Sequence, residues 1–440
     1  MIRTHTCGEL RGADAGKDVI LEGWVDTFRE TGKISFILLR DRTGITQVFV
    51  NKTLTEAHAS TLKPETVIRI RGKVNQRPDN QIRAEEKTGA IEVEATAIEI
   101  LNPSDAPLPI EMRADSTTHL DKRLDYRFLD LRRKNVQAIF RIRSQVSAVT
   151  HTFFIEEGFL NIQTPKLTAS GVESGAEEFK LDYFGKTASL AQSPQIYKQM
   201  FVVSGLEKVY AIEPIFRAEK SHTTRHLTEF TGIDFEMGFV SELEDVMKVV
   251  EKYLQTLLTR IQNECAEELE TLGVMIDIPP KIPRLSLQDA RQILSEKGKT
   301  IPEDDDLDAE GERLIGEYVK ETWGNDFVFM LDYPWKKRPF YHMRPPDDPK
   351  RTLSFDVIYK GVEIGTGALR EHRLPILDAQ AKEKGIPLDQ MTFYRDLFKY
   401  GAPPHGGIGL GLDRIIKQML NLTNVKEAIL LPRDPERLTP

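Results

Sequence analysis

Residues 216–236 combine arginine, histidine and carboxylate side chains with an aromatic ring, and these residue types suit a nucleoside triphosphate. Apolar residues on both sides predict two strands, joined by a polar connection of Ser, His and Thr. On such a hairpin, Arg217 would offer a phosphate its planar fork of N–H donors, and Phe230 would lie flat against a purine ring. For a hairpin taken alone, a solvated surface with cross-strand ion pairs is the simpler interpretation. The neighbouring segments decide between the two.

Three further segments carry residues that could act at the same place. Residues 192–199 are polar among apolar strands, residues 354–367 alternate as a strand would and are followed by Arg370, and residues 404–414 are glycine-rich before a helix expected near Leu412. Arginines fixed beside carboxylates could recognise an anion together with Mg²⁺. Each segment alone has a structural explanation, such as close packing at glycine or a strand acid paired with a lysine.

The glycine run in residues 404–414 differs from two familiar phosphate-binding loops. It lacks the Gly-x-Gly-x-x-Gly spacing of dinucleotide-binding folds, and it lacks the Gly-Lys-Ser/Thr ending of a P-loop. A different kind of nucleotide site is therefore needed.

Length and composition predict two or three domains with an ample core, since the chain has 440 residues and is 40% hydrophobic. A net charge of −8 argues against a protein that grips nucleic acid through overall positive charge. Residues 1–101 hold 15 Lys and Arg against 15 Asp and Glu, whereas the remainder holds 45 against 53. Contact with RNA is therefore expected to be local, and the N-terminal part is the better candidate.

The two cysteines, Cys7 and Cys265, are far apart and predict neither a disulfide framework nor a Cys-ligated zinc site. This usage suits a reducing cytoplasm. The N-terminus lacks an apolar signal core, and no apolar stretch reaches the length of a membrane span. We expect a cytoplasmic protein with no membrane segment.

Five short β-rich runs in the first hundred residues predict a small closed barrel, and they cover residues 19–25, 35–40, 46–50, 67–74 and 90–101. Prolines in residues 102–118 and a charged stretch over 121–134 then predict a hinge. From Val136 the apolar residues recur at gaps of three and four until Gly158, which predicts a long helix, and residues 159–162 read as a strand.

These motifs resemble, in order and over nearly the whole chain, the aspartyl-tRNA synthetases, which are class II aminoacyl-tRNA synthetases, here of the archaeal and eukaryotic cytosolic type. The long helix with residues 159–165 resembles motif 1, residues 216–236 resemble motif 2, and residues 406–414 resemble motif 3. The fragment Gln-Ser-Pro-Gln-x-x-Lys-Gln at 192–199 is similar to the amino-acid-binding signature of that family.

The resemblance implies an α+β fold with two domains. Residues 1–101 would form an OB-fold anticodon-binding β-barrel, residues 102–135 a hinge, and residues 136–440 a class II catalytic domain built on an antiparallel sheet flanked by helices. Motif 1 would form the interface of a homodimer.

The activity implied is activation of L-aspartate by ATP to aspartyl-adenylate, followed by transfer to the 3′-terminal ribose of tRNA-Asp, with tRNA-Asn left open as a second substrate. Arg217 would bind the α-phosphate and Arg414 the γ-phosphate, and both are the implied catalytic groups. The implied ATP-binding set is Arg217, Glu219, Arg225, His226, Leu227, Phe230, Glu363, Gly411 and Arg414.

The resemblance also assigns Asp356, Glu363 and Thr366 to Mg²⁺ that accompanies ATP, and oxygen-only ligands suit this ion. Asp356 and Glu363 are seven residues apart. In one continuous strand that odd spacing would place them on opposite faces unless a bulge intervenes.

For the amino acid, the resemblance implies that Lys198 and Arg370 grip the aspartate side chain. Asparagine would then leave desolvated cations facing an NH₂ donor, which rejects it strongly. The implied aspartate-binding set is Glu173, Ser193, Gln195, Lys198, Asp234, Thr366 and Arg370. Two residues depart from the family pattern, since Ser174 replaces a usual glycine and Leu369 a common glutamine.

In the barrel, the resemblance implies that Phe36 stacks on an anticodon base, with Gln47 and Arg29 beside it, as single-stranded RNA is commonly read. Pattern alone favours a core position for Phe36. Asp26 lies where relatives tune recognition of the third anticodon base. Two alternatives to an aspartate enzyme stay open, an asparaginyl-tRNA synthetase and a non-catalytic RNA-binding paralogue.

Overall fold

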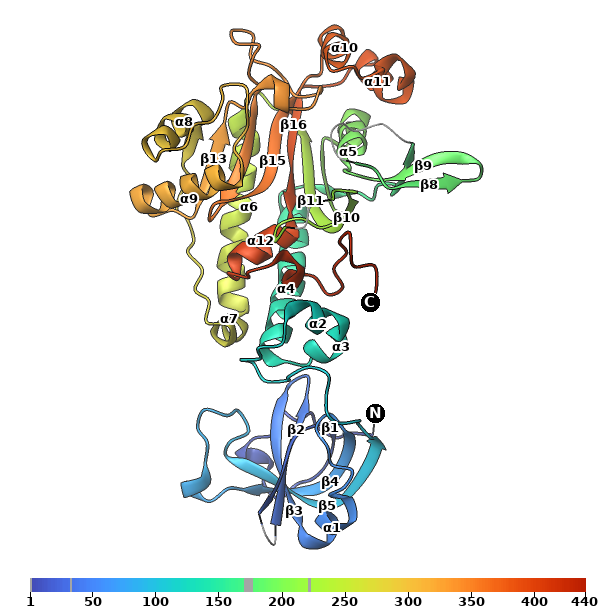
Figure 1. Cartoon of the computed structure of the whole chain (residues 1–440), viewed down its shortest axis with the longest axis vertical. Helices are drawn as coiled ribbons and strands as arrows, with labels where there is room; N and C mark the ends of the chain where they lie inside the picture. Colours follow the sequence, from blue (N-terminus) through green and yellow to red (C-terminus); the bar gives the residue numbers. More distant parts are fainter. Residues whose placement is uncertain (1, 32–33, 170–176, 221–222) are drawn as a thin grey trace. The chain divides into compact units, whose positions relative to one another are not determined.

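The computed structural model of the chain describes residues 2–31, 34–169, 177–220 and 223–440 (Figure 1). The chain divides into two compact units, residues 1–111 and residues 112–440. The last barrel strand ends at Asn102, so the predicted hinge over 102–135 is shared between the two units. No helix in the described ranges has the length and apolar character needed to cross a membrane.

The N-terminal unit is a closed five-stranded barrel, as predicted. Its strands pair in the order β1-β2-β3-β5-β4, β4 pairs back to β1, and only β3 and β5 run parallel. Alternate residues face inward, so Ile37 and Leu39 are buried while Phe36 and Leu38 are half-buried on the outer face. The elements are β1 (Asp18–Thr31), β2 (Ile34–Asp41), β3 (Gly44–Asn51), α1 (Lys52–His58), β4 (Val67–Gln76) and β5 (Ile91–Asn102).

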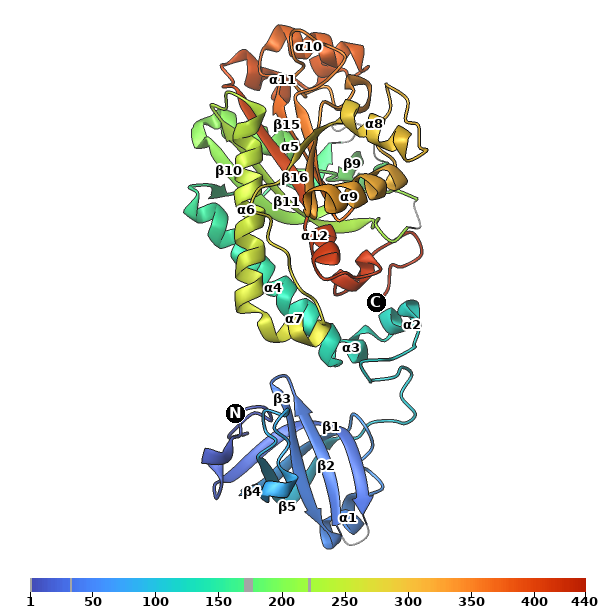
Figure 2. The same cartoon turned by 90° about the vertical axis from the view of Figure 1, so that its left-hand side faces the viewer.

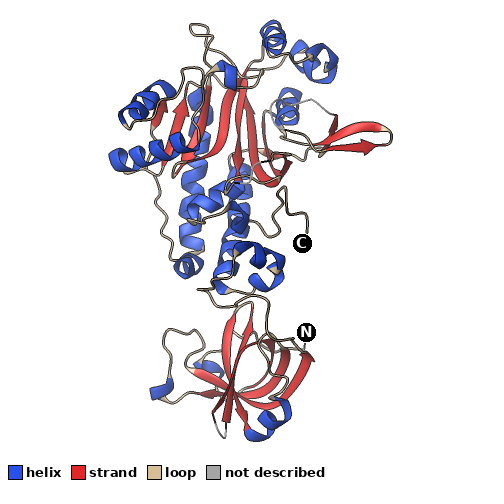
Figure 3. Ribbon diagram, in the orientation of Figure 1, coloured by secondary structure: helices blue, strands red, loops and turns tan. Residues whose placement is uncertain are grey.

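The C-terminal unit is built on an eight-stranded sheet in the order β12-β13-β14-β15-β16-β11-β10-β6. Figure 3 shows the strands of both units in red and the helices in blue. The six central strands are antiparallel, and a parallel strand is added at each edge. The mixed α+β class with an antiparallel core is therefore confirmed. The strands are β6 (Leu160–Asn161), β10 (Lys208–Phe216), β11 (Glu229–Gly238), β12 (Arg284–Ser286), β13 (Phe327–Leu331), β14 (Ser354–Tyr359), β15 (Val362–Arg370) and β16 (His405–Gly411).

A smaller sheet, β7-β9-β8, lies beside the main sheet, and its β8–β9 hairpin projects outward (Figure 1). Its strands are β7 (Leu167–Ala169), β8 (Lys180–Tyr183) and β9 (Lys186–Leu190).

Two long helices, α4 (Lys134–Glu156) and α6 (Leu243–Glu264), pack together and share one hydrophobic core with the sheet (Figure 2). Their buried residues recur at gaps of three and four, which places an apolar stripe on one side of each helix. As predicted, Gly158 follows α4 in the left-handed region, with φ +79°.

Two of the remaining helices pack on the other face of the sheet. Helices α8 and α9 share a second core with β12, β13 and β14. This core lies on the face of β13 opposite to the first core, because Val328 and Met330 in the second core alternate along the strand with Phe327 and Phe329 in the first. The remaining helices are α2 (Leu120–Asp125), α3 (Arg127–Asp130), α5 (Gln195–Phe201), α7 (Ala266–Leu272), α8 (Leu287–Glu296), α9 (Ala309–Trp323), α10 (Leu374–Glu383), α11 (Thr392–Lys399) and α12 (Leu412–Met419).

The segment expected as one alternating strand over 354–367 is instead a hairpin. Strands β14 and β15 are joined by Lys360 and Gly361, which have φ of +47° and +71° and make a two-residue turn. Asp356 pairs in register with Thr366, and the register shifts between Val357 and Ile358. The argument from a seven-residue spacing in one strand was therefore wrong.

Candidate active site

A cavity of about 390 Å³ lies on the face of β11 that points away from α4 and α6. Ile233 and Phe235 belong to the core with those helices, whereas Asp234 between them lines the cavity. The predicted segments all converge here, although they are far apart in the chain. The predicted residues that line the cavity are Ser193, Gln195, Arg217, Glu219, Arg225, His226, Leu227, Phe230, Asp234, Glu363, Thr366, Arg370, Gly411 and Arg414.

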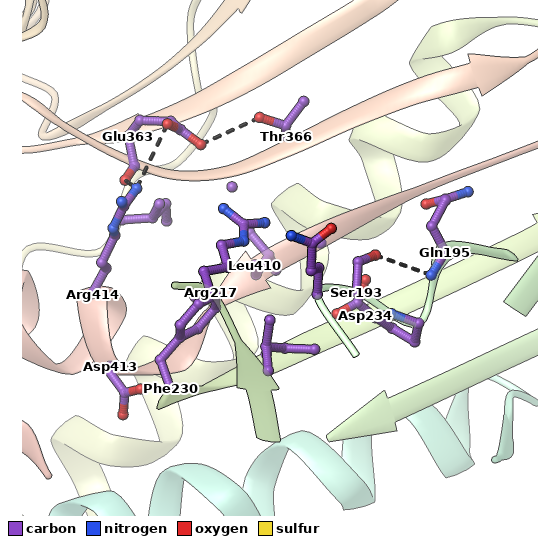
Figure 4. Close-up of a pocket in the computed structure, with 18 of the residues that line it drawn as sticks. Ser193, Gln195, Arg217, Phe230, Asp234, Glu363, Thr366, Leu410, Asp413 and Arg414 are labelled. Carbon is purple, nitrogen blue, oxygen red and sulfur yellow. Dashed lines mark hydrogen bonds and ion pairs between the residues drawn. The ribbon is translucent and has the colours of Figure 1, made fainter. Parts of the chain in front are cut away.

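At one end of the cavity, arginines make long or single contacts with carboxylates (Figure 4). Arg414 donates from Nη1 to the backbone oxygen of Glu363 at 2.9 Å, and the same nitrogen lies 3.6 Å from its carboxylate. Arg217 lies 3.9 Å from Glu219, and its guanidinium is 5.4 Å from the centre of the Phe230 ring. These groups are only partly buried, so an anionic ligand can reach them.

Glu312, in the first turn of α9, ties two parts of this end together. One of its oxygens, Oε2, accepts from Arg225 Nη1 at 2.8 Å and from the backbone N–H of Glu363 at 2.9 Å. Arg225 also donates to the backbone oxygen of Ala309 at 3.1 Å. Burial, together with the neighbouring Glu363 carboxylate, raises the pKa of Glu312 to about 7 even though Arg225 and Arg414 oppose the shift.

His226 belongs to the loop after β10 and, like Arg414, lines the cavity. Its Nδ1 is 2.6 Å from the Thr223 hydroxyl. Burial and the positive charge of Arg414 lower the pKa of His226, so its imidazole is neutral near pH 7.

At the other end, Arg370 is buried against Glu236. Its Nε donates to Glu236 Oε1 at 2.8 Å and its Nη2 donates to Oε2 at 3.2 Å, while Nη1 contacts His342 Nε2 at 3.1 Å. Burial alone would raise the pKa of Glu236. The positive charges of Arg370 and Lys198 lower it by more than burial raises it, so the pKa of Glu236 lies below its usual value. The carboxylate is ionised and Arg370 is held by it.

Lys198 does not line the cavity, unlike Arg370. Its Nζ donates to Asp234 Oδ1 at 2.9 Å and to the backbone oxygen of Ile408 at 3.0 Å, and it lies 3.4 Å from Glu236. In the free protein, the two cations predicted to grip the aspartate side chain, Arg370 and Lys198, therefore already have carboxylate partners. In this state Lys198 acts on the cavity through Asp234, which does line it.

The glycines of β16 make room for these carboxylates. A Cβ on Gly407 would lie 2.3 Å from Glu236 Oε2, and one on Gly409 would lie 3.0 Å from Asp234 Oδ1. Glycine is needed because side chains there would occupy the positions of the acids. The glycine run predicted as part of the site thus supports it through packing.

Asp356, which the resemblance assigned to a metal, is buried on the same face of the sheet as its register partner Thr366, but it does not line the cavity. Its Oδ2 accepts from Arg338 Nη2 at 2.6 Å, and the guanidinium of Arg338 stacks 3.7 Å from the centre of the Tyr333 ring. Burial raises the pKa of Asp356 to about 6 against the opposing charge of Arg338. Glu363 and Thr366 both line the cavity, and Thr366 Oγ1 donates to Glu363 Oε1 at 3.2 Å. Glu173 and Ser174 lie outside the described residues.

Several lining or supporting residues were missed from the sequence. Arg338, Tyr341 and His342 line the cavity from the loop between β13 and β14, where a run of basic and aromatic residues was the available signal. Glu236 closes the segment 216–236 but was given no role of its own, and Glu312 gave no signal, because an acid on a helix is usually a solvated side chain.

On the barrel, Arg29, Phe36 and Phe49 form one row across β1, β2 and β3, since Arg29 pairs with Phe36 and Phe36 with Phe49. The two phenylalanine rings meet edge to face, 6.1 Å apart. Gln47 donates to Glu92 at 3.0 Å. Phe36 lies on the outer face, so the interpretation of this residue as barrel core is wrong.

Comparisons with known proteins agree with this architecture. The class II tRNA synthetases (D, K and N) match residues 119–435, and the OB-fold nucleic acid binding domain matches residues 19–101. The aspartate--tRNA(Asp/Asn) ligase of Aeropyrum pernix is 44% identical over 95% of this chain and 94% of its own length. The aspartate--tRNA(Asp) ligase of Thermococcus kodakarensis is 43% identical over the whole of both chains. The asparaginyl-tRNA synthetase of Pyrococcus horikoshii, solved with asparaginyl-adenylate, has a TM-score of 0.91 at 33% identity, with both chains fully covered.

The raised pKa of Glu312 predicts a measurable pH dependence of stability. Because the folded state holds a proton that the unfolded state releases above about pH 4.5, stability contributed by Glu312 is complete below that pH and is lost as the pH rises to about 7. Glu312→Gln has no such proton. As the pH rises from about 4.5 to about 7, the free energy of unfolding of Glu312→Gln should increase relative to that of wild type by up to about 1.4 kcal/mol per pH unit. Urea unfolding at several pH values checks this, and parallel curves for the two proteins would contradict it.

Proposed function

Because the chain belongs to the class II tRNA synthetase family of D, K and N enzymes, we propose that it is an aspartate--tRNA ligase that activates L-aspartate with ATP and transfers it to tRNA-Asp. The observation that carries this proposal is the buried Arg370 at the cavity wall, held in place by Glu236, in a chain 42–44% identical to several aspartate ligases. An arginine fixed in this way presents the cation that a side-chain carboxylate needs.

The chemistry requires positioning and charge stabilisation, with no side-chain nucleophile. The α-carboxylate of aspartate attacks the α-phosphorus, and the bond to pyrophosphate breaks on the opposite side. Arg217 would bind the α-phosphate and Arg414 the γ-phosphate, while Arg225 and His226 would contact the departing pyrophosphate. The loose contacts of Arg217 and Arg414 support these roles, because a phosphate can replace a carboxylate 3.6–3.9 Å away at small cost.

The purine would lie on Phe230, beside Glu219 and Leu227. Gly411 has no side chain, so it would leave space on the opposite side of the purine. In the free protein the Arg217 guanidinium lies over the Phe230 ring. A planar cation and a purine are both suitable partners for an aromatic face, so ATP binding would exchange one for the other.

Mg²⁺ would enter with the nucleotide and would neutralise charge on the leaving phosphates. Glu363 and Thr366 fit this ion, because both offer oxygen atoms at the cavity wall within hydrogen-bond distance of each other. Asp356 fits less well in this conformation, since Arg338 takes one of its oxygens. Within the described residues no group of three or more His, Cys, Asp and Glu is arranged to hold a metal ion.

Aspartate would place its ammonium group near Ser193, Gln195 and Asp234 and its side chain against Arg370. Asparagine is the principal competitor, and an asparaginyl-tRNA synthetase is the alternative enzyme. The carboxylate-binding fork of Arg370 favours aspartate, because asparagine would turn an NH₂ donor toward N–H donors.

The barrel would read the anticodon. A half-buried Phe36 in a row with Arg29 and Phe49 supports stacking of an unpaired base with cationic and edge contacts beside it. Asp26, which lies 3.1 Å from Arg40, stays the residue at which tRNA-Asn could also be admitted or rejected. An enzyme of protein synthesis with this activity would work in the cytoplasm.

We further propose a homodimer through motif 1. Phe128, Ile155 and Leu160 expose 62%, 62% and 51% of their surface on α3, α4 and the edge strand β6. Ile155 and Leu160 lie at or near the edge strand β6, and large apolar side chains exposed beside a strand edge favour burial against a second copy.

Pyrophosphate exchange measured separately with aspartate and with asparagine tests the function. We expect exchange with aspartate and at least a hundredfold lower kcat/KM with asparagine. A preference for asparagine would establish the alternative enzyme, and exchange with neither would establish a non-catalytic paralogue.

Arg414→Ala should reduce aspartate-dependent exchange at least about a hundredfold, because it removes a charge-stabilising group from the leaving phosphates. Binding of tRNA, measured by filter retention, should remain unchanged. Arg313→Ala provides the control, since Arg313 pairs with Glu317 on the exposed side of α9. Exchange by Arg414→Ala at the wild-type rate would exclude its assigned role.

Phe36→Ala should lower kcat/KM for charging tRNA about tenfold or more through loss of base stacking, while exchange without tRNA keeps its rate. Ile45→Ala, an exposed apolar change on the same barrel, should alter neither. Full charging activity in Phe36→Ala would remove Phe36 from the RNA-binding face.

A further inference from the structure

The side chain of His342 contacts Nη1 of the Arg370 guanidinium, on the side that Glu236 does not bind. Arg370 has five N–H donors. Glu236 accepts from Nε and Nη2, and His342 Nε2 lies 3.1 Å from Nη1. No other described residue accepts from this side chain, so one N–H remains on each terminal nitrogen. Two parallel donors on neighbouring nitrogens are what a carboxylate needs for a two-point contact.

The protonation state of His342 follows from its partner. A guanidinium has no acceptor, so Nε2 must accept and the proton must lie on Nδ1. The residue is buried, with 2% of its surface exposed. Burial and the charges of Arg370, Arg338 and Lys198 lower its pKa well below the usual value. Arg370 therefore has a neutral acceptor on this side. A second carboxylate in the same place would cancel the positive charge of Arg370 that the aspartate side chain requires.

The backbone keeps His342 at this position. His342 forms an isolated β-bridge with Arg370, flanked by hydrogen bonds from Met343 N to Leu369 O at 2.9 Å and from Glu371 N to Tyr341 O at 2.9 Å. Its own carbonyl accepts from Gln380 Nε2 at 3.1 Å. The loop after β13 is thus attached to β15 on both sides of the contact.

We propose that His342 is a positioning residue for amino-acid specificity, which fixes the direction in which Arg370 offers its two remaining N–H groups to the side-chain carboxylate of the substrate. This inference rests on the proposed function. Without the imidazole, only the two hydrogen bonds to Glu236 hold the guanidinium of Arg370, which can then change its orientation. A carboxylate then loses its two-point contact, whereas ATP at the other end of the cavity is unaffected.

Steady-state exchange by His342→Leu and His342→Gln tests this role. His342→Leu removes the acceptor and should raise KM for aspartate about tenfold, with KM for ATP unchanged within about twofold and discrimination against asparagine reduced. His342→Gln restores an amide oxygen and should recover most of the aspartate affinity. A folded His342→Leu with an unchanged KM for aspartate, or with both KM values raised together, would overturn the proposal.

A control is His151→Leu, which removes a half-buried histidine on α4 that contacts the Tyr210 hydroxyl at 3.0 Å and does not line the cavity. It should lower the melting temperature without a selective change in KM for aspartate. A selective change of the same size in both variants would assign the effect to lost packing and overturn the proposal.

The tautomer gives a readout that does not depend on activity. In ¹⁵N-histidine spectra of the wild-type protein, the signal missing from His342→Gln should report the Nδ1–H form, and an Nε2–H form would overturn the contact even if His342→Leu fails to fold. Wild-type protein without aspartate-dependent exchange would instead refute the proposed function, and the tautomer would still test the Arg370 contact.

Discussion

The site depends on one buried carboxylate, Glu236, placed between two buried cations. A fully buried charge is costly unless oppositely charged groups surround it, and loss of one partner from such a cluster costs about 3–5 kcal/mol. Arg370 meets Glu236 through two hydrogen bonds, and Lys198 lies 3.4 Å away while donating to Asp234. This requirement brings β11, β15 and α5 together, and Gly407 leaves the space that the carboxylate occupies.

The two ends of the cavity differ in how their charges are paired, and the difference suits two tasks. At the end where we propose that the amino acid binds, Arg370 is buried and contacts Glu236 and His342 before a ligand arrives, and fixed donors discriminate between substrates at small reorganisation cost. At the end proposed for the nucleotide, Arg217 and Arg414 expose 42% and 26% of their side chains and keep distant carboxylate partners. Such cations can move to bind phosphates. In the free protein, the neighbouring Arg225 is held by its hydrogen bond to Glu312.

Local patterns predicted elements wherever a short stretch of sequence decides the structure. The barrel strands follow their period of two, α4 follows its apolar stripe, and the β10–β11 hairpin surrounds the polar loop as expected. The alternation over 354–367 was misinterpreted because a turn of Lys360 and Gly361 barely interrupts it. Glu312 could not be found, since an acid in the first turn of an amphipathic helix is typical of any helix and only the fold brings α9 to Glu363.

The sequence by itself determined which charged and aromatic groups are available, the elements that carry them and, through motif order, their family. Only the tertiary structure decided which charges neutralise each other. Arg370 and Glu236 are 134 residues apart, and Lys198 and Asp234 are 36 apart. In the free protein Lys198 and Asp356 therefore form buried ion pairs, with Asp234 and with Arg338, that the sequence did not predict. The physical reason is desolvation, because a charge removed from water takes whichever opposite charge the packing places within reach, and spacing along the chain does not specify that partner.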